Sequence, residues 1–348
     1  MLKKNKVFPI VSQYSAETQE KTVSPSTSEI EVMPDSGYLL NKVTVEAVTS
    51  SIDANIQAEN IKKDITILGV TGNFTNVNKV PMILDGSSVS LNADDMEGCK
   101  AIRQYLFYQN SGLTSIYIPS TVTSIGGNAF NTASALTTVT IEHSDNPSMT
   151  SIGAYAFSAC SNLTGSIKIP NSVKTLGNGA FNACKKLTSI TLGNKLTNTG
   201  NSTFSGCTGL SSVYFTGTLE EWCATPFNTE TSNPLRYGKN LYINNQLVTT
   251  ASISDGVTAI GAYVFRGCTS VTSIIIPSSV VSIGVQAFDG CTNLTSVTIN
   301  ASNPPNLSNS NAFANTNNCP IYVPDGSLER YKGETNWANL ASRIQAIP

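Results

Sequence analysis

The sequence contains eight cysteines, the residue type best suited to metal binding, disulfide formation or nucleophilic chemistry. Five of them follow a phenylalanine by three residues: Cys160, Cys184, Cys207, Cys268 and Cys291. The others are Cys99, Cys223 and Cys319. A zinc site would need Cys-x-x-Cys pairs or Cys/His clusters, and no such pair occurs. Inward-pointing side chains stacked in register rarely reach disulfide geometry. We therefore predict buried free thiols that pack as small apolar groups, with a disulfide or redox role as the alternative.

His143 is the only histidine, so a Ser/His/Asp or Cys/His nucleophile system would have to use it. Its segment, "IEHSDNPSMT", reads as a surface loop. Asp94 and Asp95 look like helix-capping groups, and Glu220 and Glu221 look like ordinary solvated charges. The turns such as "GNGAF" lack the spacing of a phosphate-binding loop. These residues predict neither catalysis nor a cofactor or metal site.

Composition narrows the choice of partners. Hydrophobic residues make up 40 % of the 348 residues, enough for a packed core. Charged residues make up only 13 %, with a net charge of −2, so no basic stripe attracts nucleic acid or an anionic membrane. The N-terminal apolar run "VFPIV" is shorter than a secretory signal needs, and no segment is apolar for long enough to span a bilayer. We expect neither nucleic-acid binding nor membrane insertion.

An internal repeat accounts for the cysteine spacing. The repeated phenylalanines recur at intervals of 23 to 27 residues, with one gap of 61: Phe130, Phe157, Phe181, Phe204, Phe265, Phe288 and Phe313. The fullest unit is "LTSIYIPSTVTSIGGNAFNTASA". A period near 23 residues lies within the range of leucine-rich repeats.

Alternation within the unit predicts which side chains point inward. Leu113, Ile116 and Ile118 point into the core, while Ser115 and Tyr117 point outward. Gly126 is then expected to turn the chain and send Phe130 into the core. One unit cannot bury its own apolar face, but stacked units bury a continuous core. The pattern predicts an α+β, mainly β solenoid.

The repeats resemble the BspA-type (Treponema-type) leucine-rich repeats of bacterial surface proteins, over roughly residues 100 to 348. The segment "YFTGTLEEWCATPF…NPLRYGKNLYINNQLV" resembles an insertion of that family. In it we expect a hairpin with Asn244 and Asn245 in its two-residue turn. Trp222 is expected either to pack under this hairpin or to be an exposed contact. The tail from Cys319 resembles the family's C-terminal ending, with a strand and an amphipathic helix from about Ser327.

The expected organisation is an N-terminal attachment module at 1–79 and a solenoid at 80–348, with an N-cap at 80–112, a hairpin insertion at 217–250 and a C-terminal cap at 319–348. In the N-cap, Met96, Cys99, Ile102 and Leu106 have helical spacing, so we expect a helix in a cap or degenerate first repeat.

The first module, residues 1–79, is expected to be β-rich. Segment 27–48 predicts two strands around "PDSGY", and segment 50–75 predicts a short helix and a strand ending at Gly72. These phrases resemble segments of phage and prophage tail-associated proteins. That resemblance implies that residues 1–79 bind other virion subunits, and a homo-oligomer is possible.

What remains for function is the outward face of the stacked strands, since solenoids use such sheets for binding. Most outward positions hold Ser or Thr, which are also good soluble strand formers. The candidate ligand-binding residues are Tyr117, Thr140, Lys168, Thr191, Tyr214, Ile275 and Thr298. We expect a non-enzymatic adhesion protein that recognises a surface protein or glycan of a bacterial or host cell, on a virion or at a cell surface. The alternatives are a structural virion decoration or spacer and a BspA-like bacterial adhesin.

Overall fold

The computed structural model describes residues 18–23, 39–45, 66–67, 70–71, 89–96, 98–142 and 148–348. In the N-terminal region, β1 (Thr18–Val23) pairs in parallel with β2 (Leu39–Val45). β3 (Thr66–Ile67) pairs antiparallel with β4 (Val70–Thr71), so the single strand predicted to end at Gly72 is instead a pair of short strands. The helix predicted before them and the loop with His143 lie outside the described residues.

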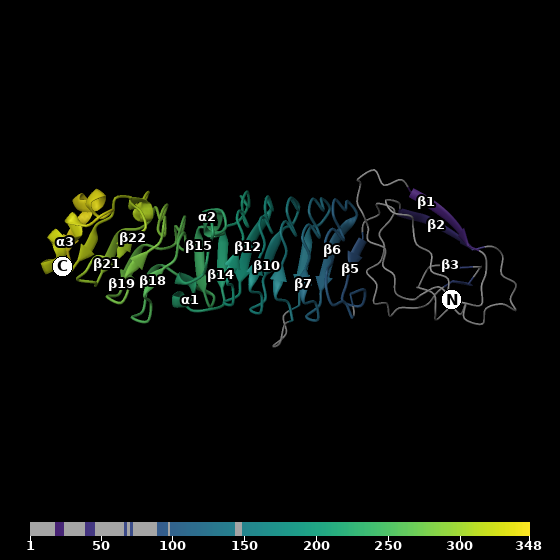
Figure 1. Cartoon of the computed structure of the whole chain (residues 1–348), viewed down its shortest axis with the longest axis horizontal. Helices are drawn as coiled ribbons and strands as arrows, with labels where there is room; N and C mark the ends of the chain where they lie inside the picture. The colour runs from purple at the N-terminus through teal and green to yellow at the C-terminus, as the bar shows by residue number, and fades with distance from the viewer. Residues whose placement is uncertain are drawn as a thin grey trace.

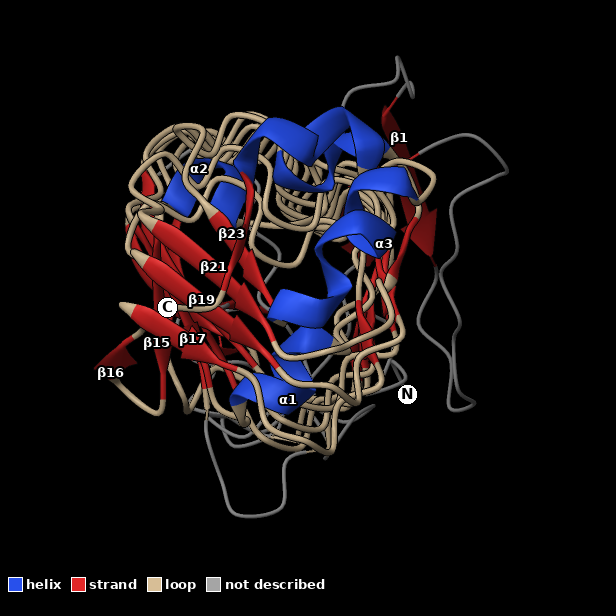
Figure 2. Ribbon diagram, turned by 90° about the vertical axis from the view of Figure 1, so that its left-hand side faces the viewer, coloured by secondary structure: helices blue, strands red, loops and turns tan. Residues whose placement is uncertain are grey.

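From residue 89 onward the chain winds into stacked coils that form one elongated rod (Figure 1). Each coil contributes a longer strand to one side of the rod, and most contribute a two-residue strand to another side (Figure 2). Buried aliphatic and aromatic side chains from every coil join in one hydrophobic core. The leucine-rich-repeat solenoid predicted from the sequence is therefore confirmed.

The longer strands form three sheets that follow one another along the rod. The first is β5 (Val89–Leu91), β6 (Leu113–Ile118) and β8 (Thr138–Ile141). The second is β10 (Gly165–Lys168), β12 (Leu187–Leu192), β14 (Ser212–Phe215), β15 (Asn240–Ile243) and β16 (Gln246–Leu247). The third is β17 (Thr250–Ser252), β19 (Ser273–Ile276), β21 (Ser296–Ile299), β23 (Ile321–Val323) and β24 (Ile344–Ala346). Every pairing is parallel except that of β15 with β16.

The two-residue strands form two further parallel sheets. One contains β7 (Ser124–Ile125), β9 (Ser151–Ile152), β11 (Thr175–Leu176) and β13 (Asn198–Thr199). The other contains β18 (Ala259–Ile260), β20 (Ser282–Ile283) and β22 (Asn306–Leu307). In each short strand the second residue is buried, and all of these residues except Thr199 are apolar, so both sides of the coil direct apolar side chains into the same core.

The repeat phenylalanines form two stacks along the core. The first contains Phe107, Phe130, Phe157, Phe181 and Phe204, and the second contains Phe265, Phe288 and Phe313. Neighbouring rings lie 4.8 to 5.6 Å apart between centroids, at interplanar angles of 3° to 13°. Each coil therefore places its ring on that of the coil before it. Trp337 continues the second stack, 5.8 Å from Phe313.

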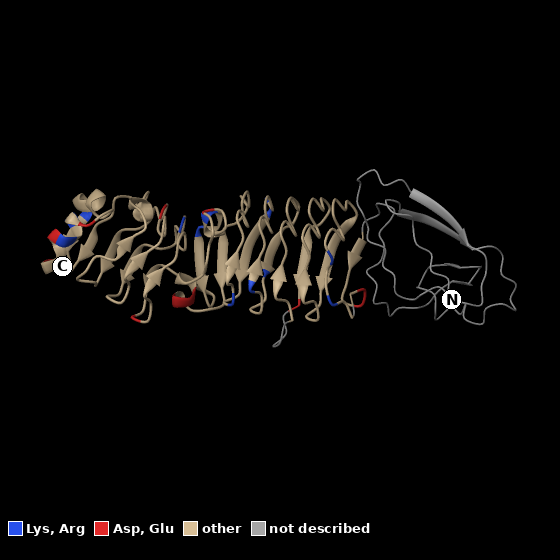
Figure 3. Cartoon of the chain, viewed as in Figure 1, with Lys and Arg blue, Asp and Glu red and all other residues tan. Residues whose placement is uncertain are grey.

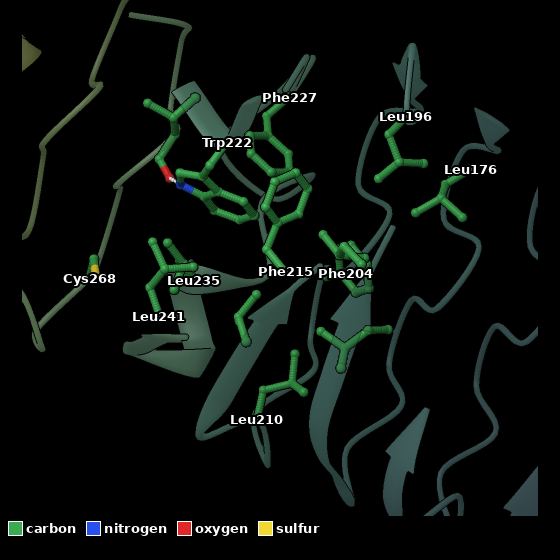
Figure 4. Close-up of a cluster of buried hydrophobic side chains, with 14 of the residues drawn as sticks. Leu176, Leu196, Phe204, Leu210, Phe215, Trp222, Phe227, Leu235, Leu241 and Cys268 are labelled. Carbon is green, nitrogen blue, oxygen red and sulfur yellow. Dashed lines mark hydrogen bonds between the residues drawn. The ribbon is translucent and has the colours of Figure 1, made fainter. Parts of the chain in front are cut away.

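The insertion fills the space between the two stacks. α1 (Leu219–Cys223) begins at Thr218, which forms a capping box with Glu221, and α2 (Leu235–Gly238) follows. Trp222 is fully buried and donates from Nε1 to the carbonyl of Val264 at 2.9 Å. Its ring lies 5.2 Å from Phe215 and 5.3 Å from Phe227 (Figure 4). Trp222 is therefore buried and not an exposed contact, and its neighbours are Phe215, Phe227 and Val264.

The hairpin expected within the insertion is also present. Tyr242 pairs with Leu247 and Ile243 with Gln246. Asn244 and Asn245 form the turn, with φ of 48° and 64°. Asparagine tolerates this left-handed conformation better than most residues, which explains its use at both positions.

The helix predicted around Met96 to Leu106 is wrong. The described residues of this stretch form turns and one isolated bridge, from Ile102 to Ile125, and backbone donors reach the next coil: Tyr105 N to Gly127 O at 3.1 Å, and Phe107 N to Ala129 O at 2.6 Å. The predicted helical spacing arose because the corners of a coil also bring every third or fourth side chain inward. Of the two readings offered for this segment, a cap or a degenerate first repeat, the structure supports the repeat. Phe107 is its stacking phenylalanine.

The C-terminal end closes with short helices and one more strand. η2 (Ser310–Phe313) precedes β23, which is followed by η3 (Asp325–Ser327), α3 (Leu328–Gly333) and η4 (Ala338–Arg343). The helix predicted from about Ser327 is thus six α-helical residues long. A further strand, β24, pairs in parallel with β23 after these helices. In the described part of the chain, no helix combines the length and apolar character needed to cross a membrane.

The first repeat glycine has a different role from the one predicted. At Gly126 an added Cβ would lie 2.3 Å from the backbone nitrogen of Gln104 in the preceding coil. The left-handed turn comes two residues later, at Asn128, with φ of 54°. Gly126 is therefore needed for the close approach of two backbones, and the following residues turn the chain.

Candidate binding face

The cysteines are free thiols, and all except Cys99 are buried, which confirms the main prediction for them. Their thiols have a further role that the sequence analysis missed. Cys184 Sγ donates to the carbonyl of Phe157 at 3.1 Å, and the same contact to the preceding phenylalanine is made by Cys160, Cys207 and Cys291. Each thiol thus satisfies a buried backbone acceptor between two coils.

These thiols are unsuited to nucleophilic chemistry. Burial raises the pKa of Cys160 and of Cys223 to about 12. A hydrogen bond with Cys207, together with burial, raises the pKa of Cys184 well above its usual value. Reactive cysteines need a lowered pKa and access to solvent, so this arrangement favours a structural role.

The carboxylates singled out in the sequence serve local structure. Asp94 and Asp95 donate from their backbone N–H groups to Asn92 Oδ1, and Asp95 Oδ2 accepts from the backbone N–H of Asn92 at 2.9 Å, so Asp95 caps a turn rather than a helix. Glu221 is part of the capping box of α1 instead of a free solvated charge. Hydrogen bonds from Ser254 and Thr218 lower the pKa of Glu220. Within the described ranges, no three His, Cys, Asp or Glu side chains cluster as metal ligands.

An ion-pair network joins the insertion to the repeats that follow it. Glu230 lies 2.8 Å from both Arg236 Nη1 and Arg266 Nη2, and Arg266 Nε lies 3.0 Å from the buried Asp289. Asn315 and Gln286 donate to the same Asp289 carboxylate. The sequence analysis did not identify this network, because its members come from three separate coils.

The long strands line up their outward side chains in register, and two rows result. The first row contains Ser115, Thr138, Ser166, Ser189, Ser212, Asn240, Thr250, Ser273 and Ser296. The second, here called the outer row, contains Tyr117, Thr140, Lys168, Thr191, Tyr214, Tyr242, Ser252, Ile275, Thr298, Tyr322 and Gln345.

All seven candidate ligand-binding residues occupy the outer row. Tyr117 is paired with Thr140, and Ile275 with Thr298. Lys168, Thr191 and Tyr214 occupy the same register position on three neighbouring strands. The register therefore brings the candidate residues of each sheet together. Their role in binding a ligand stays a prediction.

The structure adds residues to this row that the sequence analysis did not select. Tyr242 stacks on Tyr214, with ring centroids 4.6 Å apart and an interplanar angle of 18°. Tyr322 pairs with Thr298 near the C-terminal end. Tyr242 lies in the predicted insertion and Tyr322 in the predicted C-terminal cap, so neither belongs to a regular repeat of the sequence. The alternation of buried Leu241 with outward Tyr242 is the signal that could have identified Tyr242.

Charged side chains are scarce on the strands. Within the bounds of the long strands from β5 onward, all of which the structure describes, Lys168 is the one charged residue. Figure 3 shows the charged residues mostly in loops and at the ends of the rod. Glu142 follows β8 directly; the backbone N–H of Ser120 binds it and lowers its pKa. Partial burial and the charge of Glu142 raise the pKa of Tyr117, which hydrogen-bonds to that carboxylate.

Comparisons with known proteins agree with the repeat architecture. The model of the BspA type leucine rich repeat region matches residues 100–234 and 236–334 in six copies. Comparison with curated proteins gives no match.

Three solved structures resemble the fold. A leucine rich repeat protein of T. pallidum is 23 % identical and aligns over 60 % of this chain and 79 % of its own, with a TM-score of 0.35. A leucine rich cell surface protein from Faecalibacterium prausnitzii is 22 % identical over 72 % and 83 %, with a TM-score of 0.31. The pneumococcal vaccine antigen PcpA is 16 % identical over 71 % and 83 %, with a TM-score of 0.30.

The family model covers more than half of the chain, and the coils that it matches are the coils that carry the stacked phenylalanines and the outer row. This chain belongs to the BspA-type leucine-rich repeat family.

Proposed function

We propose that this chain is a non-enzymatic recognition or adhesion protein that binds a ligand on a bacterial or host cell surface through its outer row. The observation that carries the proposal is the strand register, which places Tyr117, Lys168, Tyr214 and Ile275 at the same outward position within the three successive sheets. Aromatic side chains dominate binding energy at many interfaces, and a solenoid presents them over a long surface. The family, whose members generally act by binding, supports this class of function.

The finer proposal concerns the particle that carries the protein. The two N-terminal phrases support a phage or prophage appendage in which residues 1–79 bind other virion subunits. The family itself favours a second candidate, a bacterial cell-surface adhesin. Both candidates use the same outer row, so the binding test applies to either.

The test is binding of the labelled full-length protein to intact bacterial and host cells, measured by flow cytometry. The Tyr117→Ala/Tyr214→Ala variant is compared with Tyr105→Ala/Tyr155→Ala, which removes two exposed tyrosines from the turns instead of the strands. We expect saturable binding by the natural sequence, a loss of about tenfold in the first variant and no change in the second. Binding to no cell type, together with incorporation into purified virions, would favour the structural spacer instead.

A further inference from the structure

One part of the outer row has a distinct chemistry. Thr191, Tyr214, Tyr242 and Leu247 lie next to one another on β12, β14, β15 and β16, and we call them the tyrosine ridge. The two tyrosine rings stack, and Leu247 is 45 % exposed beside Tyr242. The ridge ends the second sheet, because the next long strand, β17, pairs only within the third sheet.

The hydroxyl groups of the ridge are free to bind a ligand. Those of Thr191, Tyr214 and Tyr242 make no hydrogen bond to any residue that the structure describes. Some other hydroxyls of the solenoid are used internally: Thr188 donates to Gly165 O at 2.8 Å, and Ser211 donates to Thr188 O at 3.2 Å. The Tyr117 hydroxyl is likewise bonded to Glu142. The ridge therefore combines apolar ring surface with three unused hydroxyls.

Charge complementarity points to an uncharged partner. From β12 to β24, a span that the structure describes throughout, no outward strand position holds an ionised side chain. A nucleic acid or an anionic polymer would find a single counter-charge beside the ridge, Lys168, which pairs with Thr191, and one cation is too few to hold a polyanion. About 25 % of the residues of a typical protein are charged, and the charges on a partner protein's surface would be desolvated against this face without counter-charges. A neutral polyol matches the free hydroxyls group for group.

Spacing favours a chain of sugars over a single one. Neighbouring coils are stacked at about the 5 Å separation of paired strands, so ring and hydroxyl groups recur along the rod with that period. One residue of an extended pyranose chain has a similar length. Such a chain, lying along the rod, would meet one outward side chain per sugar.

We propose that the tyrosine ridge binds a neutral linear polysaccharide whose chain runs along the solenoid axis. The proposal rests on the proposed function and names its ligand class. The edges and exposed faces of Tyr214 and Tyr242 contact the sugar rings, and their hydroxyls, with that of Thr191, exchange hydrogen bonds with the sugar hydroxyls.

The first experiment uses the full-length protein and purified polysaccharides, by biolayer interferometry. The neutral probes are mannan, dextran, galactan and β-glucan, and the anionic probes are heparin and dextran sulfate. We expect binding to at least one neutral probe, with an affinity that changes less than about twofold over a tenfold range of salt. Binding to the anionic probes alone, or to none of the probes, would overturn the proposal.

Matched variants then locate the site. Tyr214→Ala/Tyr242→Ala is expected to weaken binding at least about tenfold. Tyr214→Phe/Tyr242→Phe keeps the rings and is expected to cause a smaller loss through its missing hydroxyls. Tyr105→Ala/Tyr155→Ala, with the same composition change on the turns, should bind like the natural sequence. Circular dichroism confirms that each variant is folded, and equal binding by all of them would overturn the assignment to the ridge.

Binding to cells treated with periodate or with protease distinguishes the polysaccharide ligand from the more general recognition function. Periodate destroys vicinal diols of glycans, whereas protease removes surface proteins. Loss of cell binding after periodate supports the polysaccharide ligand. Cell binding that survives periodate but is lost after protease overturns it, while the recognition function stands. A protein that binds no cells at all contradicts the recognition function itself.

Discussion

The rings of Phe157 and Phe181 stack in the core, with centroids 5.3 Å apart and an interplanar angle of 7°, although 24 residues separate them in the sequence. The same relationship repeats between successive coils, so each coil is stabilised mainly by the coils above and below it. A defect at one position should therefore weaken its own coil and the two contacts beside it.

Removal of a ring from the middle of the stack tests this view. Phe181 is fully buried between Phe157 and Phe204, so Phe181→Ala leaves a cavity that the neighbouring coils cannot fill. We expect the free energy of unfolding to fall by about 3 to 5 kcal/mol in denaturant titrations. Val281→Ala, at a side chain that is 65 % exposed, should change it by less than about 0.5 kcal/mol. A similar small change for Phe181→Ala would contradict the shared core.

Gly→Ala substitutions provide a second test of the stacked coils. A glycine that allows two backbones to approach closely should not tolerate alanine, whereas a glycine with free space around it should. An added Cβ at Gly177 would lie 2.3 Å from the backbone nitrogen of Ala154, so Gly177→Ala must force two coils apart. We expect a destabilisation of at least about 2 kcal/mol, seen as a lower Tm. At Gly256 an added Cβ has no neighbour within 4 Å, and Gly256→Ala should be neutral or stabilise by up to about 1 kcal/mol. Equal effects at the two sites would show that backbone proximity is not the reason for Gly177.

Much of the fold could be predicted from the sequence because the period and the alternation act together. Ile116 and Phe130 recur at matching places in later units, and both are fully or almost fully buried. The first coil could not be predicted this way. Its inward residues Met96, Ile102 and Leu106 have a spacing that also fits a helix, and only the hydrogen bonds to the next coil distinguish the two.

The candidate site was predictable in position but not in chemistry. Alternation placed Tyr214 outward, and the register of the strands confirms that position. Its stacking on Tyr242 depends on a strand that lies 28 residues further on, inside the insertion, where the repeat period is interrupted. In the same way, the hydrogen bond from Cys184 to Phe157 joins two coils and leaves no local sequence signal.

The buried thiols predict a loss of stability in alkali. Burial raises the pKa of Cys160 from 9.0 to about 12 in the folded protein. Below about pH 9 the thiol is protonated in both states, so its contribution is fully present. As the pH rises toward 12, the unfolded thiol loses its proton first, and the free energy of unfolding falls by up to about 1.4 kcal/mol per pH unit.

Cys160→Ser is the matched variant for this effect. Serine can still donate to the carbonyl of Phe130, but its hydroxyl does not titrate in this range. Denaturant titrations at about pH 8 and about pH 10.5 should therefore show a smaller loss of stability in the variant than in the natural sequence. Equal losses in both proteins would show that Cys160 is not responsible for the alkaline effect.

The ion pair between Arg266 and Asp289 should contribute strongly to stability, because Asp289 is buried. The Asp289 side chain is only 5 % exposed, and Arg266 is its one cationic neighbour among the described residues. Arg266→Ala leaves that carboxylate buried without a counter-charge, so we expect a destabilisation of about 3 kcal/mol. Asp289→Asn should cost less, because it removes the buried charge itself. The double variant should then be more stable than Arg266→Ala alone, by a coupling energy that a double-mutant cycle measures.

Lys332→Ala is the control: it breaks a pair with Glu329, whose side chain is 91 % exposed, and should change stability by less than about 0.5 kcal/mol. Additive effects of the two substitutions at Arg266 and Asp289 would show that the contact between these residues contributes nothing to joining their two coils.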